Sequence, residues 1–162
     1  MIFLDTSAVL KGYVSEAGSP SVHAARARFA ARLFLTTHVV LEVLTTLAKL
    51  LRAREIDRQT YVRARSEFLA DCARDYQMVE VDEGVVLRSY VLADAHRQVS
   101  IGAMDLLHLS AALELQRMQA NRPLVVASAD RGLLAVAVAL GLSTFDPETE
   151  PFSSLLAKVG QR

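Results

Sequence analysis

The stretch Ile2-Phe3-Leu4-Asp5 is a short apolar run that ends in a carboxylate, and it introduces the pattern of the whole chain. Short runs with β-strand character alternate with longer segments of helical periodicity, which is typical of a parallel sheet with crossover helices. The predicted strands are Ile2-Phe3-Leu4, Leu33-Phe34-Leu35, Met78-Val79-Glu80-Val81, Leu124-Val125-Val126-Ala127 and Ser143-Thr144-Phe145. The sequence therefore predicts an α/β protein, a three-layer α/β/α sandwich around a parallel sheet of about five short strands.

Helical periodicity fills the segments between these strands. The expected helices are Val9 to Val14, Ser21 to Arg32, Val39 to Arg54, Arg58 to Asp75, Glu83 to Gln98, Ala103 to Ala120 and Arg131 to Leu140. Segments 39–54 and 58–75 are separated only by Glu55-Ile56-Asp57, which predicts an antiparallel helical hairpin inserted between the second and third strands. We expect one domain over residues 1–150 and a C-terminal tail, 151–162, with room for one helical turn.

The composition is that of an ordinary globular chain. It has 162 residues, 52% of them hydrophobic, and a formal net charge of zero, so the overall charge does not indicate a polyanion partner. Between Arg26 and Arg65 the sequence has nine basic residues and three acidic ones. This surplus of positive charge favours solvated helix faces, and a phosphate-contacting face is the alternative. The single cysteine, Cys72, excludes an internal disulfide and a multi-cysteine zinc site, and we expect it in the core. No apolar stretch is long enough for a signal peptide or a membrane span, so we expect a cytoplasmic protein.

Two aspartates follow predicted strands. Asp5 comes directly after the first strand, and Asp130 follows the fourth by way of Ser128 and Ala129. Ligands of open parallel sheets bind beyond the carboxyl ends of the strands, so both aspartates are candidate site residues. Each also stands where a helix begins, and capping that helix is the alternative role for either one taken singly.

Two further acids lie in the first turns of predicted helices. Asp105 is surrounded by the apolar residues of Gly102-Ala103-Met104-Asp105-Leu106-Leu107-His108-Leu109. An ionised carboxylate among apolar residues is costly unless it is paired or bound to a cation, which makes Asp105 the most informative residue of the chain. The alternative for Asp105 is a first-turn acid that faces water. Glu42 follows the second strand, but it has i, i+3, i+4, i+7 spacing with Thr45, Thr46 and Lys49, and this periodicity by itself favours a solvated stripe.

We refer to Asp5, Glu42, Asp105 and Asp130 as the four acids. Each stands at the start of a helix, and together they would converge on one edge of the sheet. Because like charges repel, clustered carboxylates persist only around a cation or with raised pKa values. Ligation by carboxylate oxygens selects hard ions such as Mg²⁺ or Mn²⁺ over zinc.

The order and spacing of the motifs around these acids resemble the PIN-domain family, and within it the VapC-like toxins of bacterial toxin–antitoxin pairs. The resemblance covers nearly the whole chain and rests on Ile2-Phe3-Leu4-Asp5-Thr6-Ser7, Val40-Leu41-Glu42-Val43-Leu44, Met104-Asp105-Leu106-Leu107-His108-Leu109-Ser110-Ala111-Ala112 and Val126-Ala127-Ser128-Ala129-Asp130-Arg131-Gly132-Leu133-Leu134, followed by Ala137 and Gly141.

This resemblance implies a PIN-like fold and a Mg²⁺- or Mn²⁺-dependent endoribonuclease that hydrolyses RNA, with the four acids as catalytic and metal-binding residues. It also implies a homodimer and a small cognate antitoxin as partners. Hydroxyls of Thr6, Ser7 and Ser128 could orient a carboxylate or simply cap helices. We expect His108, on an apolar helix, to be a packed and hydrogen-bonded core residue outside the site.

Four other functions are alternatives to this one. A phosphatase of the haloacid dehalogenase type needs a second acid two residues after Asp5, where this chain has Ser7. A nucleotide-binding module is disfavoured because none of the seven glycines forms a phosphate-binding loop. A catalytically silent PIN-like module that binds RNA or acts as a scaffold, or a PIN nuclease that is not a toxin, stays open.

Overall fold

Five parallel strands form the centre of the computed structural model, which describes residues 1–160. The strands are β1 (Ile2–Leu4), β2 (Leu33–Thr36), β3 (Gln77–Val79), β4 (Val125–Ala127) and β5 (Ser143–Phe145), in the order β3-β2-β1-β4-β5. The chain builds the sheet outward from β1, first on one side and then on the other. The strand order therefore reverses between β1 and β4, which is where a crevice forms beyond the carboxyl ends of the strands.

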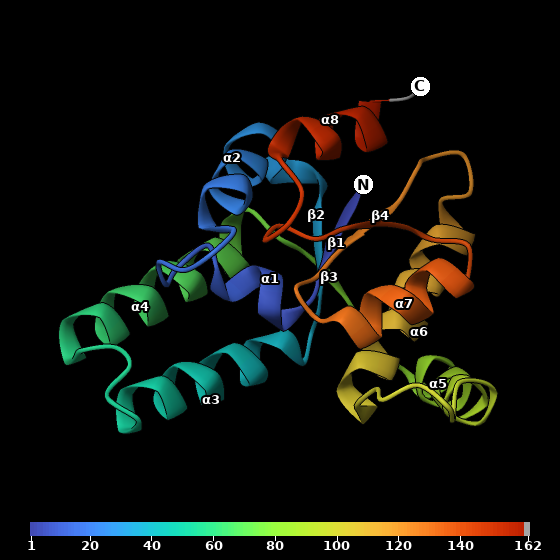
Figure 1. Ribbon diagram of the computed structural model, residues 1–162, viewed down its shortest axis with the longest axis horizontal. Coiled ribbons are helices and arrows are strands. Elements are labelled where there is room, and N and C mark those ends of the chain that lie inside the picture. The colour runs from blue at the N-terminus through green and yellow to red at the C-terminus, as the bar shows by residue number, and fades with distance from the viewer. Residues whose placement is uncertain (161–162) are drawn as a thin grey trace.

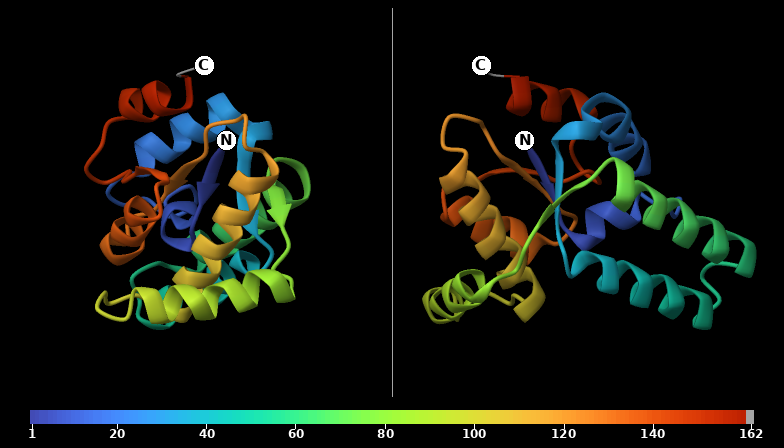
Figure 2. Two further views of the ribbon diagram at one scale, coloured as in Figure 1. Left: turned by 90° about the vertical axis from the view of Figure 1, so that its right-hand side faces the viewer. Right: turned by 180° about the vertical axis from the view of Figure 1, so that it is seen from behind.

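Helices cover both faces of this sheet (Figures 1 and 2). They are α1 (Thr6–Leu10), α2 (Ser19–Phe29), α3 (Val39–Arg52), α4 (Arg58–Arg74), α5 (Glu83–Ala95), α6 (Ala103–Met118), α7 (Arg131–Ala139) and α8 (Phe152–Gly160), with a 3-10 turn at Ala30–Arg32. One apolar cluster packs residues of α1 to α4 and α8 against the sheet, and a second packs residues of α5 to α7 against the other face. The predicted α/β/α sandwich with a parallel sheet is confirmed.

Strand β1 shows how the sequence produces the two layers. Ile2 and Leu4 belong to the first cluster and Phe3 to the second, because successive side chains of a strand point to opposite faces. All three are at most 2% exposed, as expected for a parallel sheet covered on both sides.

The helical hairpin is also confirmed. Helices α3 and α4 lie between β2 and β3 in the chain and project together from the body of the protein (Figure 1). Arg54, in the turn between them, has a φ of 60°, and Asp57 begins α4 by accepting a hydrogen bond from Thr60 N. Val43 and Leu47 on α3 and Phe68 on α4 are fully buried, so the pair packs through an apolar face.

Several element boundaries differ from the sequence prediction. The first helix begins at Thr6 and ends at Leu10, because Asp5 caps it immediately after β1. The third strand begins at Gln77 and ends at Val79, where its partner β2 ends. The C-terminal segment is longer than a single turn: α8 spans nine residues, and its Leu155 and Val159 join the first apolar cluster. Cys72 is only partly buried and packs at the edge of that cluster.

Within residues 1–160, no helix has the length and apolar character needed to cross a membrane.

The packing of α8 can be tested with two adjacent leucines. Leu155 is fully buried, whereas Leu156 is 39% exposed. We expect Leu155→Ala to lower the free energy of unfolding by about 2–5 kcal/mol, since it leaves a cavity in the core. Leu156→Ala, the matched control, should cost less than about 1 kcal/mol. Urea unfolding of both variants measures the difference, and equal small losses would show that α8 is not part of the core.

Candidate functional site

Asp5 lies at the carboxyl end of β1 and caps α1. Its carboxylate accepts hydrogen bonds from Ala8 N at 2.9 Å, Ser7 Oγ at 2.8 Å and Ser128 Oγ at 2.8 Å. The residue is 3% exposed, and burial raises the pKa of this carboxyl although the three hydrogen bonds oppose the shift. Asp5 therefore caps α1, as considered from the sequence. It is also a buried acid bonded to Ser128, which follows β4.

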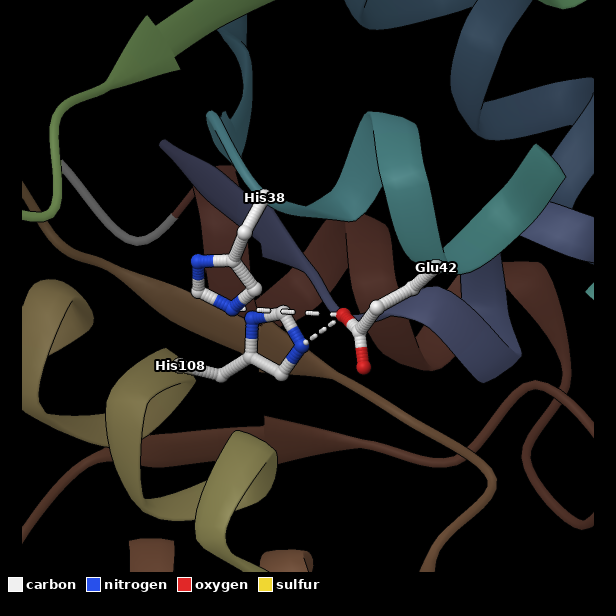
Figure 3. A group of neighbouring side chains, drawn as sticks. All are labelled: His38, Glu42 and His108. Atoms are coloured by element: carbon white, nitrogen blue, oxygen red, sulfur yellow. Dashed lines mark hydrogen bonds and ion pairs between the residues drawn. The ribbon is translucent and has the colours of Figure 1, made fainter. Parts of the chain in front are cut away.

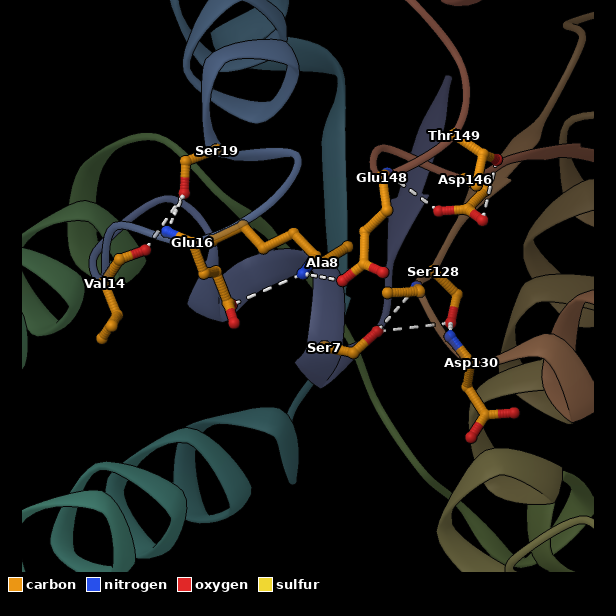
Figure 4. Close-up of polar contacts among 12 residues, drawn as sticks. Ser7, Ala8, Val14, Glu16, Ser19, Ser128, Asp130, Asp146, Glu148 and Thr149 are labelled. Carbon is orange, nitrogen blue, oxygen red and sulfur yellow. Dashed lines mark hydrogen bonds and ion pairs between the residues drawn. The ribbon is translucent and has the colours of Figure 1, made fainter. Parts of the chain in front are cut away.

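Ser7 and Ser128 join the turn after β1 to the turn after β4, and we call them the serine bridge. Ser7 Oγ accepts a hydrogen bond from Ala129 N at 2.8 Å, and Ser128 Oγ accepts one from Asp130 N at 2.9 Å. Figure 4 shows the two hydroxyls lying next to each other, with Oγ atoms 3.4 Å apart. Because both hydroxyls also donate to Asp5, the bridge fixes the position of its carboxylate.

Glu42 lies in the first turn of α3 and faces inward. Thr6 Oγ1 donates to its Oε2 at 2.7 Å, and His108 Nε2 lies 2.9 Å from the same oxygen. Burial alone would raise the pKa of Glu42, but the hydrogen bonds from His108 and Thr6 outweigh it and lower the pKa. Glu42 is thus held as a carboxylate, and it does not belong to the solvated stripe that its spacing also allowed.

His108, on α6, is 2% exposed and hydrogen-bonded, so the expectation of a packed core histidine is confirmed. Its Nδ1 lies 3.1 Å from Thr36 Oγ1 at the end of β2. Sequence reasoning placed it outside the site, whereas the structure places it in contact with one of the four acids.

His38, which no motif singled out, stacks on His108 with ring centroids 4.7 Å apart. Burial and the neighbouring His108 lower the pKa of His38 to about 4, so it is neutral near pH 7. Its position immediately after β2 was the signal that could have identified it.

Asp105 is the third residue of α6 and is partly buried. Its carboxylate accepts a hydrogen bond from Gly102 N at 2.9 Å. Burial raises the pKa of Asp105, the bond from Gly102 opposes this, and the charges of Asp130 and Glu42 raise it further. The structure therefore brings Asp105 into the electrostatic range of two other members of the four acids.

Asp130 caps α7 by accepting a hydrogen bond from Leu133 N at 2.8 Å, and it is exposed. Its side chain points away from the serine bridge (Figure 4). Position 132, two residues later, has no room for a side chain. A Cβ there would lie 2.4 Å from Ser100 O and 3.1 Å from Asp130 Oδ1, so the position requires glycine. Gly132 therefore lets the loop that contains Ser100 approach the start of α7. Helix α6, with Asp105 in its first turn, follows this loop.

The four acids thus lie at the carboxyl edge of the sheet, after β1, β2 and β4 and at the start of α6. None of them forms an ion pair with a lysine or arginine of residues 1–160. Three potential metal ligands lie close together: the ligand atoms of His38, Glu42 and His108 are all within 4.8 Å of one another (Figure 3). Within residues 1–160 this is the group of at least three histidine, cysteine or acidic side chains that meets this distance.

An open hollow of about 330 Å³ borders this edge between α1, α3 and the loop after β5. Ser7 and Asp130 line its inner end, and Leu50 lines it from α3. Lys11 also lines it and is held by Glu148 at 2.6 Å. Among the four acids, Asp130 is the one that lines this hollow.

Comparison with known proteins places this arrangement in context. The profile of the family described as PIN domain matches residues 2–139. No curated protein matches the sequence significantly. Among solved structures, FitAcB from Neisseria gonorrhoeae is 21% identical, with a TM-score of 0.66 over 93% of this chain and 100% of that chain. VapC20 from Mycobacterium tuberculosis, described as a sarcin-ricin loop cleaving toxin, is 16% identical, with a TM-score of 0.64 over 93% and 100%. VapBC2 from Rickettsia felis, bound to a promoter DNA fragment, is 13% identical, with a TM-score of 0.63 over 90% and 98%.

The close approach at Gly132 predicts that Gly132→Ala is destabilising. The added methyl group must displace the Ser100 carbonyl or the Asp130 side chain, which should cost about 1–3 kcal/mol of unfolding free energy. Gly160→Ala is the control, because a Cβ there meets nothing within 4 Å, and it should change stability by less than about 0.5 kcal/mol. Urea unfolding compares them; unaltered stability of Gly132→Ala would mean that the two segments do not touch.

The raised pKa of Asp105 predicts a pH-dependent stability difference between wild type and Asp105→Asn. Below the ordinary aspartate pKa both carry a neutral group and should be equally stable. As the pH rises from the ordinary aspartate pKa to the raised one, the unfolded chain ionises before the folded wild type does, so the stability of the wild type should fall relative to the variant.

Thermal unfolding in EDTA between about pH 3 and pH 8 measures this difference. Asp94→Asn is the control, because the Asp94 side chain is 88% exposed. A wild type that gains stability over Asp105→Asn with rising pH would contradict the burial of an uncompensated charge.

Proposed function

This chain belongs to the PIN-domain family, and we propose that it is a divalent-metal-dependent endoribonuclease that hydrolyses phosphodiester bonds of RNA. In this proposal the metal-binding and catalytic residues are Asp5, Glu42, Asp105 and Asp130. Under the proposal the RNA substrate reaches them through the hollow beside Ser7 and Asp130.

The observation that carries the proposal is uncompensated negative charge. The four acids share one edge of the sheet, burial raises the pKa of two of them, Asp5 and Asp105, and no lysine or arginine of residues 1–160 pairs with any of them. Among the basic side chains of these residues, only His38 and His108 lie within ion-pair distance of one of the four acids, Glu42, so most of this charge is left to be balanced by something else. Carboxylate oxygens are the ligands that Mg²⁺ and Mn²⁺ prefer, so the donor set fits such a cation.

When bound, Mg²⁺ or Mn²⁺ would supply positive charge for a phosphoryl oxygen and acidify a bound water. The residues of the chain prepare this edge. The serine bridge holds the Asp5 carboxylate in one orientation, and Thr6 and His108 hold that of Glu42. Asp105 and Asp130 are less restrained, since each accepts one backbone hydrogen bond and is more exposed than Asp5. They are suited to adjust as substrate binds.

We further propose that the nuclease is the toxin of a toxin–antitoxin pair that acts in the cytoplasm. The similar folds of FitAcB and the VapC and VapBC proteins support this, although their identities to this chain are low. A small antitoxin would inhibit the enzyme by covering the hollow beside Ser7 and Asp130.

A homodimer is part of the same proposal. Helix α5 carries an exposed apolar stripe with i, i+3, i+4 spacing: Leu87 is 53%, Tyr90 64% and Val91 67% exposed. Apolar groups this close together on a surface helix are typical of a face that packs against another protein. The stripe is the face we propose for the second copy.

Cleavage of single-stranded and structured RNA by the purified protein tests the proposed activity. With Mg²⁺ or Mn²⁺ the wild type should shorten RNA, and EDTA should abolish this. Asp105→Asn should reduce the rate by at least about 100-fold, because it removes one charged ligand at nearly constant shape.

Asp94→Asn, a change of the same type at an exposed site, should retain wild-type activity. If wild type and Asp105→Asn bind RNA equally with and without Mn²⁺ and neither shortens it, the silent RNA-binding module is the correct alternative.

A further inference from the structure

Two imidazoles converge on one carboxylate beside the proposed magnesium site. His38 precedes α3, Glu42 lies one turn into that helix, and His108 comes from α6 (Figure 3). Their ligand atoms all lie within 4.8 Å of one another. Two histidines and one carboxylate are the ligand set of many zinc and non-haem iron centres.

We propose that His38, Glu42 and His108 form a site for a divalent transition-metal ion of the zinc class. Ligand atoms in tetrahedral zinc sites lie about 3.3 Å apart, as bonds of about 2.0–2.2 Å require. His108 Nε2 is 2.9 Å from Glu42 Oε2, and His38 Nε2 is 3.9 Å from the same oxygen. The first separation is shorter than this value and the second is longer, so the side chains must rotate to reach the tetrahedral spacing.

The surroundings of the triad favour ligation by the His108 ring. Thr36 Oγ1 lies 3.1 Å from His108 Nδ1 and would accept a hydrogen bond from a protonated Nδ1, which leaves the lone pair of Nε2 for the ion. In the metal-free state Nε2 carries a proton that bonds to Glu42, since an ionised carboxylate can only accept. Binding therefore moves this proton off Nε2, either to Nδ1 or to solvent. The side chains of His38 and Glu42 are 17% and 23% exposed, which gives an ion access from that side.

The nitrogen ligands distinguish this site from the one proposed for Mg²⁺. Imidazole binds zinc-class ions well, whereas Mg²⁺ requires oxygen ligands. Both sites use Glu42, so a zinc-class ion on the triad withdraws this carboxylate from the four acids. If the proposed nuclease activity is correct, such an ion inhibits it; the site itself does not depend on that activity.

Zinc titration of the metal-stripped, untagged protein tests the site, with Mg²⁺ in excess to keep Zn²⁺ from binding Asp5, Asp105 and Asp130. We expect one Zn²⁺ per chain, measured by calorimetry without RNA. His38→Ala should weaken binding by at least about tenfold, the smallest loss usual for changes around a metal. His38 is the residue to change because His108, at 2% exposure, is part of the core.

His96→Ala is the matched control, since His96 lies at the end of α5 and outside the triad, and it should bind Zn²⁺ like the wild type. Two outcomes overturn the proposal. In the first, His38→Ala binds Zn²⁺ as tightly as the wild type. In the second, Asp105→Asn weakens zinc binding tenfold while His38→Ala does not, which would place the ion among the four acids. Because binding is measured without RNA, an inactive protein leaves this test valid.

Discussion

The parallel pairing of β1 with β4 is the contact on which the rest of the site depends. It aligns Leu4 with Ala127, so the turns that follow the two strands emerge side by side. Residues 123 positions apart then form the hydrogen bond between Ser128 and Asp5. The strand order reverses at this point, which leaves the crevice open for a ligand. A change that displaced either strand would separate the serine bridge from Asp5 and dismantle the site.

Burial of negative charge explains how this edge can combine stability with function. Asp5 is almost fully buried, and hydrogen bonds from two hydroxyls and one backbone amide replace its water. Hydrogen bonds reduce the cost of burying a carboxylate, but they do not neutralise its charge. Asp105 also keeps an unfavourable charge, because its one hydrogen bond from Gly102 does not offset its burial and the nearby charges of Asp130 and Glu42. A cation that bound these carboxylates only in the folded state would therefore stabilise the fold, because such binding shifts the folding equilibrium.

The accuracy of the sequence prediction varied with how local the signal was. Five strands, their parallel arrangement and the helical hairpin followed from hydrophobic periodicity, and the structure confirms them. The start of α1 was misplaced because a single capping residue, Asp5, defines it, and periodicity is not visible in five residues. Helix α8 was underestimated because its stability comes from Leu155 and Val159 packing onto a distant core.

The sequence by itself determined the α/β/α fold and the placement of acids after strands and in first turns of helices, because these follow from short-range periodicity and from the geometry of parallel sheets. Only the tertiary structure decided which side chains meet. His108 and Glu42 are 66 positions apart, and their contact requires both the strand order and the rotation of α6 about its axis. Neither is encoded in local spacing. The serine bridge and the triad of His38, Glu42 and His108 are therefore properties of the folded chain, produced where elements distant in sequence pack against the same edge.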